Sequence, residues 1–256
     1  MPEIDPKEVM IAVPVIGDID PELTAFMMKA VKYGFETRIF KNYTPMPHVQ
    51  NVMATSFMKS EYKKLWMIDS DMVPRENIFS LLDMDADIVG PLYPRSHMGF
   101  IEEQPRVSFC AYRYKDVFDV DTFEDYWPEV GTGVQDVSVV GTGCMIVKRR
   151  VFEDADMVLG REWTHMDGSL RDDTDEELIP YFRNTYSAVG KYKGGNDVDF
   201  CLRARRLGYD VQVNTNVLCG HRKSIDLSIL VKLTEYFRGR IPAEMFMDTS
   251  SGTERL

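Results

Sequence analysis

Strand-like and helix-like segments alternate along residues 9–92, and this alternation limits the possible folds more than any other feature of the chain. Apolar runs predict buried strands at 9–14, 65–68 and 86–92, and a mixed run predicts another at 36–41. Helices are predicted between them: one starting at Pro21 with Asp20 as N-cap, the others over 47–60 and 76–82. Because a helix that connects neighbouring strands tends to make them parallel, the order predicts an α/β fold, a Rossmann-like sandwich with a mostly parallel central sheet.

The rest of the chain is less regular. Strands are predicted at 107–114, 137–140, 144–147, 210–213 and 217–219, with an exposed acidic and aromatic excursion at 116–127. A helix is predicted over 196–207, with Asn196 as N-cap and Gly208 at its end, and an amphipathic helix over 226–238. The acidic stretch 161–177 is predicted to be a loop. With no repeat and no Pro/Gly-rich linker, residues 1–240 are expected to form one domain, followed by a polar tail at 241–256.

The charge and cysteine content narrow the functional class. The chain has 30 basic and 41 acidic residues, a net charge of −11, which argues against a broad surface that tracks nucleic-acid phosphates. No apolar run is long enough for a membrane span, and the acidic N-terminus lacks the pattern of a secretory signal. The four cysteines are widely spaced, without zinc-site or disulfide spacing. These features together predict a cytoplasmic protein.

The triplet Asp69-Ser70-Asp71 directly follows the predicted strand 65–68. Side chains two residues apart on an extended strand share a face, so both carboxylates can converge on one hard cation. Several other D-x-D triplets occur in the chain, but only this one follows a buried strand and precedes a helix started by proline. Ligands of open α/β sheets bind at the carboxyl ends of strands, which favours Asp69 and Asp71 as cation ligands. The alternative is an acidic turn that caps the next helix.

Asp197 is a second candidate, because it lies in the first turn of the helix predicted over 196–207, after a flexible glycine pair. The helix dipole and the free N–H groups there favour the carboxylate and are expected to lower its pKa. Asp199, two residues on, is expected only to complement the dipole. The alternative is that both acids merely begin the helix.

Two further segments follow or precede short strands. His221 follows a short extended run and is either a metal ligand or an ordinary hydrogen-bonded histidine. Gly141-Thr142-Gly143 is expected to offer free backbone N–H groups to a ligand, or else to form a tight turn. The sequence contains neither a P-loop motif nor a G-x-S-x-G motif, so those two enzyme classes have no motif support.

The chain resembles the nucleotide-sugar glycosyltransferases of the GT-A fold in a set of segments and in their order. The segments are an early strand ending at Pro14, then IDSDM, VVGTGCMIVKRRVFE, GGNDVDFCLRARRLGYDV and VLCGH. The chain is most similar to the family 2-like bacterial and viral enzymes, over roughly residues 9–221. The resemblance implies that Asp69 and Asp71 hold Mn²⁺ or Mg²⁺ against the diphosphate of a UDP- or GDP-sugar, with His221 completing the metal site. It implies that Asp197 is the catalytic base, although Asn196 stands where the family has glutamate. The implied donor-binding residues are Pro14, Val15, Asn51, Asp69, Ser70 and Gly143, with Gln50 in place of the family's arginine.

This resemblance implies a hexosyl- or pentosyltransferase acting on a soluble acceptor with a free hydroxyl. A hydroxymethylated base in phage DNA is an alternative acceptor, disfavoured by the net charge of −11 although Arg203, Arg205, Arg206, Arg222 and Lys223 could form a basic edge. A sugar-nucleotide nucleotidyltransferase is an alternative activity, but VPVIGDIDP has no Gly-rich loop with a basic residue after the first strand. A non-catalytic sugar- or partner-binding module with a decayed site is the third reading, supported by the missing glutamate.

Overall fold

The computed structural model describes residues 5–15, 17–41, 45–101, 104–124, 126–160, 178–186 and 192–222. The predicted loop at 161–177, the predicted helix at 226–238 and the tail at 241–256 lie outside these residues. No helix in the described ranges is both long and apolar enough to cross a membrane.

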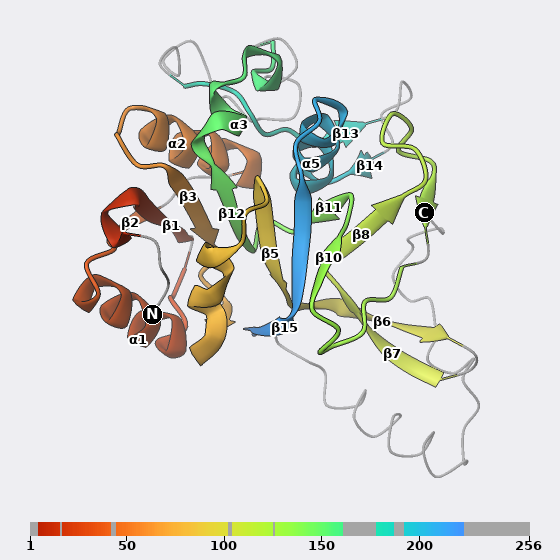
Figure 1. The fold of residues 1–256 in the computed structure, drawn as a ribbon, viewed down its shortest axis with the longest axis horizontal. Helices are drawn as coiled ribbons and strands as arrows, with labels where there is room; N and C mark the ends of the chain where they lie inside the picture. The colour runs from red at the N-terminus through yellow and green to blue at the C-terminus, as the bar shows by residue number, and fades with distance from the viewer. Residues whose placement is uncertain are drawn as a thin grey trace.

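An eight-stranded central sheet organises the molecule, in the order β10-β15-β5-β12-β3-β1-β2, with β4 pairing with β15 (Figure 1). Strands β1, β2, β3, β5 and β15 run in one direction, whereas β12 and β10 run antiparallel to their neighbours. The bounds are β1 Val9–Val15, β2 Glu36–Lys41, β3 Lys64–Ile68, β4 Met72–Pro74, β5 Ile88–Leu92, β10 Val134–Asp136, β12 Cys144–Lys148 and β15 Val211–His221. The predicted α/β sandwich with a mostly parallel sheet is confirmed.

Helices cover both faces of this sheet (Figure 1). One face packs against α1 Pro21–Lys32 and the 3₁₀-helix η2 Glu76–Asp83, and the other against α2 Met46–Met58, α3 Arg149–Glu153 and α5 Asn196–Arg206. Short 3₁₀-helices also occur at η1 Pro6–Glu8 and η3 Ala155–Met157. Alternate residues of β1 supply the two cores: Val9 and Ile11 belong to the α1 side, Met10 and Ala12 to the α2 side. A strand buried on both faces is therefore continuously apolar.

Local caps account for where two of the helices begin and end. The Asp20 carboxylate accepts the Glu22 N–H at 2.8 Å and Pro21 fills the first turn, as predicted. The prediction for α5 was wrong by one residue: Gly195 is the N-cap, and Asn196 is the first helical residue, whose side chain donates to Gln50. Gly208 ends this helix with a φ of 88°, a conformation that favours glycine.

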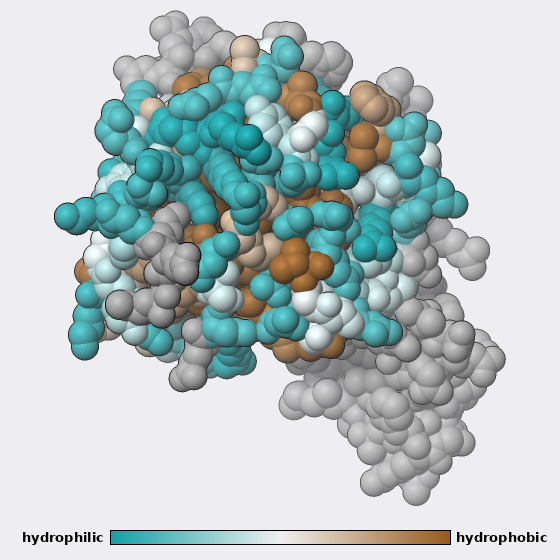
Figure 2. Space-filling model, in the orientation of Figure 1, coloured by the Kyte–Doolittle hydropathy of each residue, from teal (hydrophilic) through white to brown (hydrophobic). Residues whose placement is uncertain are grey.

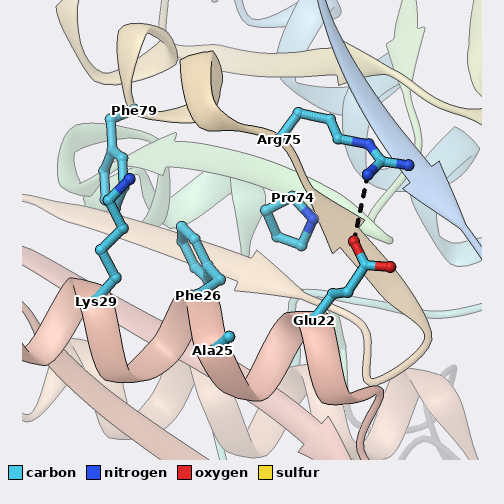
Figure 3. A pocket seen from close by; sticks show the side chains of 7 residues that line it. All are labelled: Glu22, Ala25, Phe26, Lys29, Pro74, Arg75 and Phe79. Carbon is cyan, nitrogen blue, oxygen red and sulfur yellow. Dashed lines mark hydrogen bonds and ion pairs between the residues drawn. The ribbon is translucent and has the colours of Figure 1, made fainter.

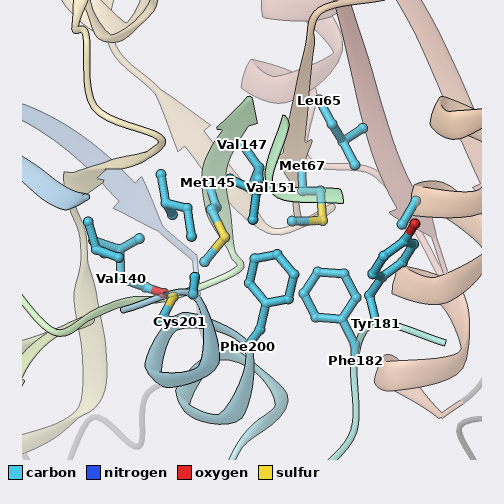
Figure 4. Packing of buried hydrophobic residues seen from close by; sticks show 14 of the residues in the cluster. Leu65, Met67, Val140, Met145, Val147, Val151, Tyr181, Phe182, Phe200 and Cys201 are labelled. Atoms are coloured by element: carbon cyan, nitrogen blue, oxygen red, sulfur yellow. Dashed lines mark hydrogen bonds between the residues drawn. The ribbon is translucent and has the colours of Figure 1, made fainter. Parts of the chain in front are cut away.

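Aromatic packing fixes α5 against the sheet (Figure 4). The rings of Phe182 and Phe200 stack with centroids 4.4 Å apart, and Phe152 contacts Phe200 from α3. Each fully buried phenylalanine contributes about 1.5–3 kcal/mol relative to an exposed one. Because this cluster holds the helix in place, it also fixes the position of the residues at the start of α5.

The remaining strands form small sheets beside the central one. They are the hairpin β6 Pro94–Ile101 and β7 Gln104–Phe109, the set β8 Ala111–Tyr114, β9 Phe123–Glu124 and β11 Val139–Val140, and the pair β13 Thr185–Tyr186 and β14 Tyr192–Gly194. The single strand predicted at 107–114 is divided at Cys110, and the pieces at 210–213 and 217–219 belong to one irregular strand, β15. Hydrophilic residues dominate the described surface in Figure 2, with apolar groups scattered among them.

Candidate active site

Several strands meet at one edge of the central sheet, and their ends position the candidate site. The parallel strands β3, β5 and β15 finish at this edge, and the antiparallel β12 starts there. The contacts confirm the convergence: the Asp69 N–H donates to Gly143 O at 2.9 Å, and the Gly143 N–H donates to the Tyr93 hydroxyl at 3.1 Å. The Tyr93 ring lies edge-on to the ring of His221, with centroids 5.7 Å apart.

Asp71 and His221 face each other at this edge. The Nε2 atom of His221 lies 3.4 Å from Oδ2 of Asp71, and its Nδ1 atom lies 2.9 Å from the carbonyl oxygen of Pro94. A carbonyl oxygen only accepts hydrogen bonds, so Nδ1 carries the proton in this contact. In a neutral ring Nε2 then directs a lone pair toward a carboxylate, which is unfavourable unless a proton or a cation lies between them.

This geometry fits a cation only in part. A metal-binding histidine commonly donates its other ring N–H to a backbone carbonyl, as His221 does to Pro94. In the part of the chain that the structure describes, however, no three His, Cys, Asp or Glu side chains are close enough together to hold a metal ion. Asp69, Asp71 and His221 do not form such a group among the described residues, and their role as cation ligands stays a prediction. Asp71 and His221 fit a cation held jointly with substrate phosphate oxygens and water, as Mg²⁺ sites commonly are.

Asp197 lies in the first turn of α5 with a partly exposed side chain, and its Oδ1 accepts the Val198 N–H at 2.9 Å. Burial raises the pKa of Asp197, whereas the hydrogen bond from Val198 and the charge of Arg95 lower it, and burial prevails. The expectation that the helix start would lower this pKa was wrong in the net direction, because desolvation outweighs the helix-start donors. A raised pKa makes this carboxylate a stronger base than an ordinary aspartate.

Tyr93 is a buried tyrosine that contacts both Gly143 and His221. Burial raises its pKa first, and the negative charges of Asp197 and Asp69 raise it further, so the phenol stays protonated. Cys110 acts on the Tyr93 pKa in the same direction as these two acids. Sequence reasoning missed Tyr93, although it is the first residue after β5, and the strand-end argument that selected Asp69 also applies to it.

The Gly-Thr-Gly segment makes room for Tyr93. Its expected free N–H groups are used within the protein: the Gly141 N–H donates to Cys110 O at 2.9 Å, and that of Gly143 to Tyr93. A Cβ atom added to Gly141 would lie 2.0 Å from the Tyr93 hydroxyl oxygen, far inside van der Waals contact. The glycines therefore allow a close approach by a side chain, and a donor-binding role for the Gly143 N–H has no support in these contacts.

Asn51 is enclosed in the α2 side of the core. Its side chain is 0% exposed; Oδ1 accepts the N–H groups of Tyr181 and Phe182 at 2.8 Å, and Nδ2 donates to Phe182 O at 3.0 Å. These bonds use both ends of the amide, so Asn51 positions the segment at 178–186 and has no face for a donor substrate. The neighbouring Gln50 donates to Thr142 at 2.9 Å and accepts from Asn196, which ties the start of α5 to the Gly-Thr-Gly segment.

The remaining predicted donor-binding residues lie at the same edge. Pro14 and Val15 form the buried end of β1. Ser70 is half-buried, and its carbonyl oxygen accepts the Asp20 N–H at 2.9 Å. Pro14 and Val15 pair with Phe40 and Lys41 of β2, whereas Ser70 follows β3, and their binding of a substrate stays a prediction.

Asp199 is a structural acid, unlike its neighbour Asp197. Its carboxylate is 5% exposed and pairs with Arg183 at 3.1 Å and with Arg203 at 2.8 Å. Arg203 also donates to the carbonyl oxygens of Met157 and Tyr181. The expectation that Asp199 only complements the helix dipole is too weak, because this network joins α5 to the segments at 155–157 and 178–186.

A pocket of about 250 Å³ lies beside the site but does not contain its acids (Figure 3). Phe26 from α1 and Phe79 from η2 line its apolar part, and an ion pair between Glu22 and Arg75 closes one end at 3.3 Å. Glu22 also pairs with Arg222 at 2.8 Å, next to the end of β15. The pocket is thus connected to the candidate site through these charges and through Pro74, which lines it and pairs with Cys219 of β15.

Comparison with known proteins gives similarity of overall structure alone. No protein-family model and no curated protein matches the sequence. Similar solved structures include A197 from STIV (16% identity, covering 85% of this chain and 87% of that chain, TM-score 0.49) and GalNAc-T7 with UDP, GalNAc and Mn²⁺ (9%, 85% and 43%, TM-score 0.47). The inositol-1-phosphate CTP transferase from T. maritima is also similar (11%, 96% and 98%, TM-score 0.41). At these identities and scores the likeness assigns no residue and no activity to this chain.

Proposed function

We propose that the protein is a metal-dependent glycosyltransferase that moves a hexose or pentose from a UDP- or GDP-sugar to an acceptor hydroxyl. One observation carries the proposal: Tyr93 contacts both His221 of the Asp71–His221 pair and Gly143, and Gln50 ties the Gly-Thr-Gly segment to Asn196, the residue before Asp197. Transfer of a sugar from a nucleoside diphosphate requires two parts: side chains that hold a cation, and a separate carboxylate that acts as the base. The resemblance of the sequence motifs to GT-A enzymes supports the same conclusion.

The donor half is assigned to the end of β3 and the end of β15. Mn²⁺ or Mg²⁺, when bound with the donor, would offset the negative charge that grows on the departing nucleoside diphosphate. Asp71 and His221 would hold it, and the hydrogen bond from His221 Nδ1 to Pro94 fixes the ring with Nε2 toward Asp71. We assign Pro14, Val15 and Ser70 to the donor side because they lie at the neighbouring strand ends.

The acceptor half is assigned to the start of α5. The anomeric carbon passes through an oxocarbenium-like state, and a carboxylate on the acceptor side removes the proton of the attacking hydroxyl. Asp197 takes this role, because its raised pKa and partly exposed side chain suit a base that must reach a substrate. Such a base contributes typically about two to four orders of magnitude in rate.

Calorimetric titration with UDP and GDP, with and without Mn²⁺, tests the donor half. Asp71→Ala should abolish Mn²⁺-dependent nucleotide binding and leave the melting temperature near that of the wild type or higher, because it removes the carboxylate that faces the Nε2 lone pair of His221. Asp121→Ala, in an exposed D-x-D triplet on the excursion, is the matched control and should bind normally. Normal nucleotide binding by Asp71→Ala would make these acids structural.

Product analysis by mass spectrometry separates the competing functions. Sugar transfer from a UDP- or GDP-sugar supports the proposal. Release of pyrophosphate from a nucleoside triphosphate would indicate a nucleotidyltransferase, and binding without turnover would indicate a non-catalytic module.

A further inference from the structure

Arg95 differs from the other arginines whose side chains the structure describes. Each of the others makes a hydrogen bond or an ion pair: Arg38, Arg75, Arg113, Arg149, Arg150, Arg183, Arg203, Arg205, Arg206 and Arg222. Within the same described residues, Arg95 has neither a carboxylate nor a carbonyl partner, and its side chain is exposed. A guanidinium group with five donors and no acceptor among the described residues is suited to bind an external anion.

The guanidinium group is nevertheless held in place. It lies over the ring of Tyr112 in β8, 5.3 Å from the ring centroid. Contact with an aromatic face orients the planar group and leaves its N–H edges open. Arg95 also directly follows Pro94, whose carbonyl oxygen accepts from His221, so its backbone is fixed to the candidate site.

The charge of Arg95 acts on the acceptor side of the site. It favours the ionised forms of Asp197, Cys110 and Tyr112, against the burial that raises the pKa of each. These groups lie at the start of α5 and on or beside β8, the half of the site assigned to the acceptor. The cation therefore lies within electrostatic reach of the residue that would deprotonate the acceptor.

We propose that Arg95 binds an anionic group, a phosphate or a carboxylate, on the acceptor. This inference rests on the proposed glycosyltransferase function and narrows its substrate class to small acidic acceptors. A polyanion such as DNA is disfavoured, because Asp116, Asp119 and Asp121 are exposed on the excursion that begins at the end of β8. A neutral acceptor would leave the one unpaired guanidinium of the described side chains without a role.

The test compares glucose 6-phosphate with glucose as probes, titrated by calorimetry into protein saturated with UDP and Mn²⁺. The wild type should bind the phosphate at least about tenfold more tightly, the usual scale of one charge-assisted hydrogen bond. Arg95→Gln should remove that preference without changing UDP affinity or the melting temperature. Arg113→Gln is the matched control, since Arg113 likewise lies over a tyrosine ring, 4.2 Å from the Tyr126 centroid, and is the neighbour of Tyr112 on β8. It should leave both affinities unchanged.

Three results would overturn the inference: equal binding of both probes by the wild type, equal effects of Arg95→Gln and Arg113→Gln, or loss of UDP binding in Arg95→Gln. The last result would assign the cation to the donor diphosphate. If the wild type binds no nucleotide with Mn²⁺, the proposed function fails, and the same pair of probes titrated without nucleotide still decides whether the anion site exists.

Discussion

Replacing Asp199 by asparagine should destabilise the protein while leaving the folded enzyme active. The Asp199 carboxylate is 5% exposed and compensates Arg203, which is 11% exposed, and Arg183, which is 24% exposed. Asparagine keeps the shape but removes the charge, so two guanidinium groups lose their counter-ion. Breaking a buried ion pair costs about 3–5 kcal/mol, and the partial exposure of Arg183 favours the lower end. A loss of about 3 kcal/mol lowers the melting temperature by roughly 6–12 °C in a chain of this size.

Replacing Asp197, two residues earlier, should have the opposite effect. Burial raises its pKa in the folded state, so wild-type stability is lost as the pH rises through that pKa. Asparagine carries no charge and still accepts the Val198 N–H. Asp197→Asn should therefore be at least as stable as the wild type at neutral pH, with the difference vanishing in acid. Because it cannot take a proton, its transfer rate should fall by about a hundredfold or more.

Thermal denaturation at neutral and acidic pH, together with product formation per folded molecule below the lowest melting temperature, measures both variants. Asp199→Asn should lose stability and keep its rate, and Asp197→Asn should keep stability and lose its rate. An Asp199→Asn variant that melts with the wild type would refute the ion-pair reasoning. Normal turnover by Asp197→Asn would show that another residue is the base.

Three further predictions concern the same region. Gly141→Ala should destabilise by about 1–3 kcal/mol through the clash with the Tyr93 hydroxyl, and adding Tyr93→Phe should restore part of the loss in urea unfolding; no restoration would contradict the close-approach argument. Asn51→Ala should cost about 2–4 kcal/mol, since two buried N–H groups lose their acceptor, whereas an unchanged urea midpoint would mean that water replaces the amide. The transfer rate should fall as the pH drops through the raised pKa of Asp197, giving an acid limb above the ordinary carboxyl pKa of 3.8; a limb at or below that value would point to a different base.

Local signals in the sequence were sufficient for much of the fold. The strand at Glu36–Lys41 and the helix starting at Pro21 have their predicted limits there, because alternating side chains and the Asp20 cap act over a few residues. Asp71 and His221 lie side by side although they are far apart in sequence. Asp71 was predicted from its place at a strand end, because strand ends of an α/β sheet share one edge, and His221 from the resemblance to GT-A enzymes; whether they bind a cation stays a prediction.

Other features of the fold and of the candidate site depend on long-range packing and could not be predicted from the sequence. Neither the reversed direction of β12 nor the reason for a glycine at Gly141 is visible locally, since both depend on which strand and which side chain come to lie beside them. The pKa of Asp197 was predicted with the wrong sign for the same reason. Helix-start donors are evident in a sequence, whereas the burial that outweighs them is a property of the assembled core.

The antiparallel course of β12 has a consequence for how such a chain can diversify. Strand β5 ends, and β12 begins, at the same edge of the sheet, so the stretch at 93–143 leaves and re-enters the framework at neighbouring points. It carries Arg95, Tyr112 and the exposed excursion, while Asp71 and His221 belong to other segments. An exchange inside this stretch would leave the pairings among β1, β2, β3, β5 and β12 unchanged, provided that it keeps Tyr93, Pro94 and the strand β10, which contact Gly143, His221 and β15. Under the proposed function, acceptor preference could therefore change by exchange of the residues between these anchors, while Asp71 and His221 stay as they are.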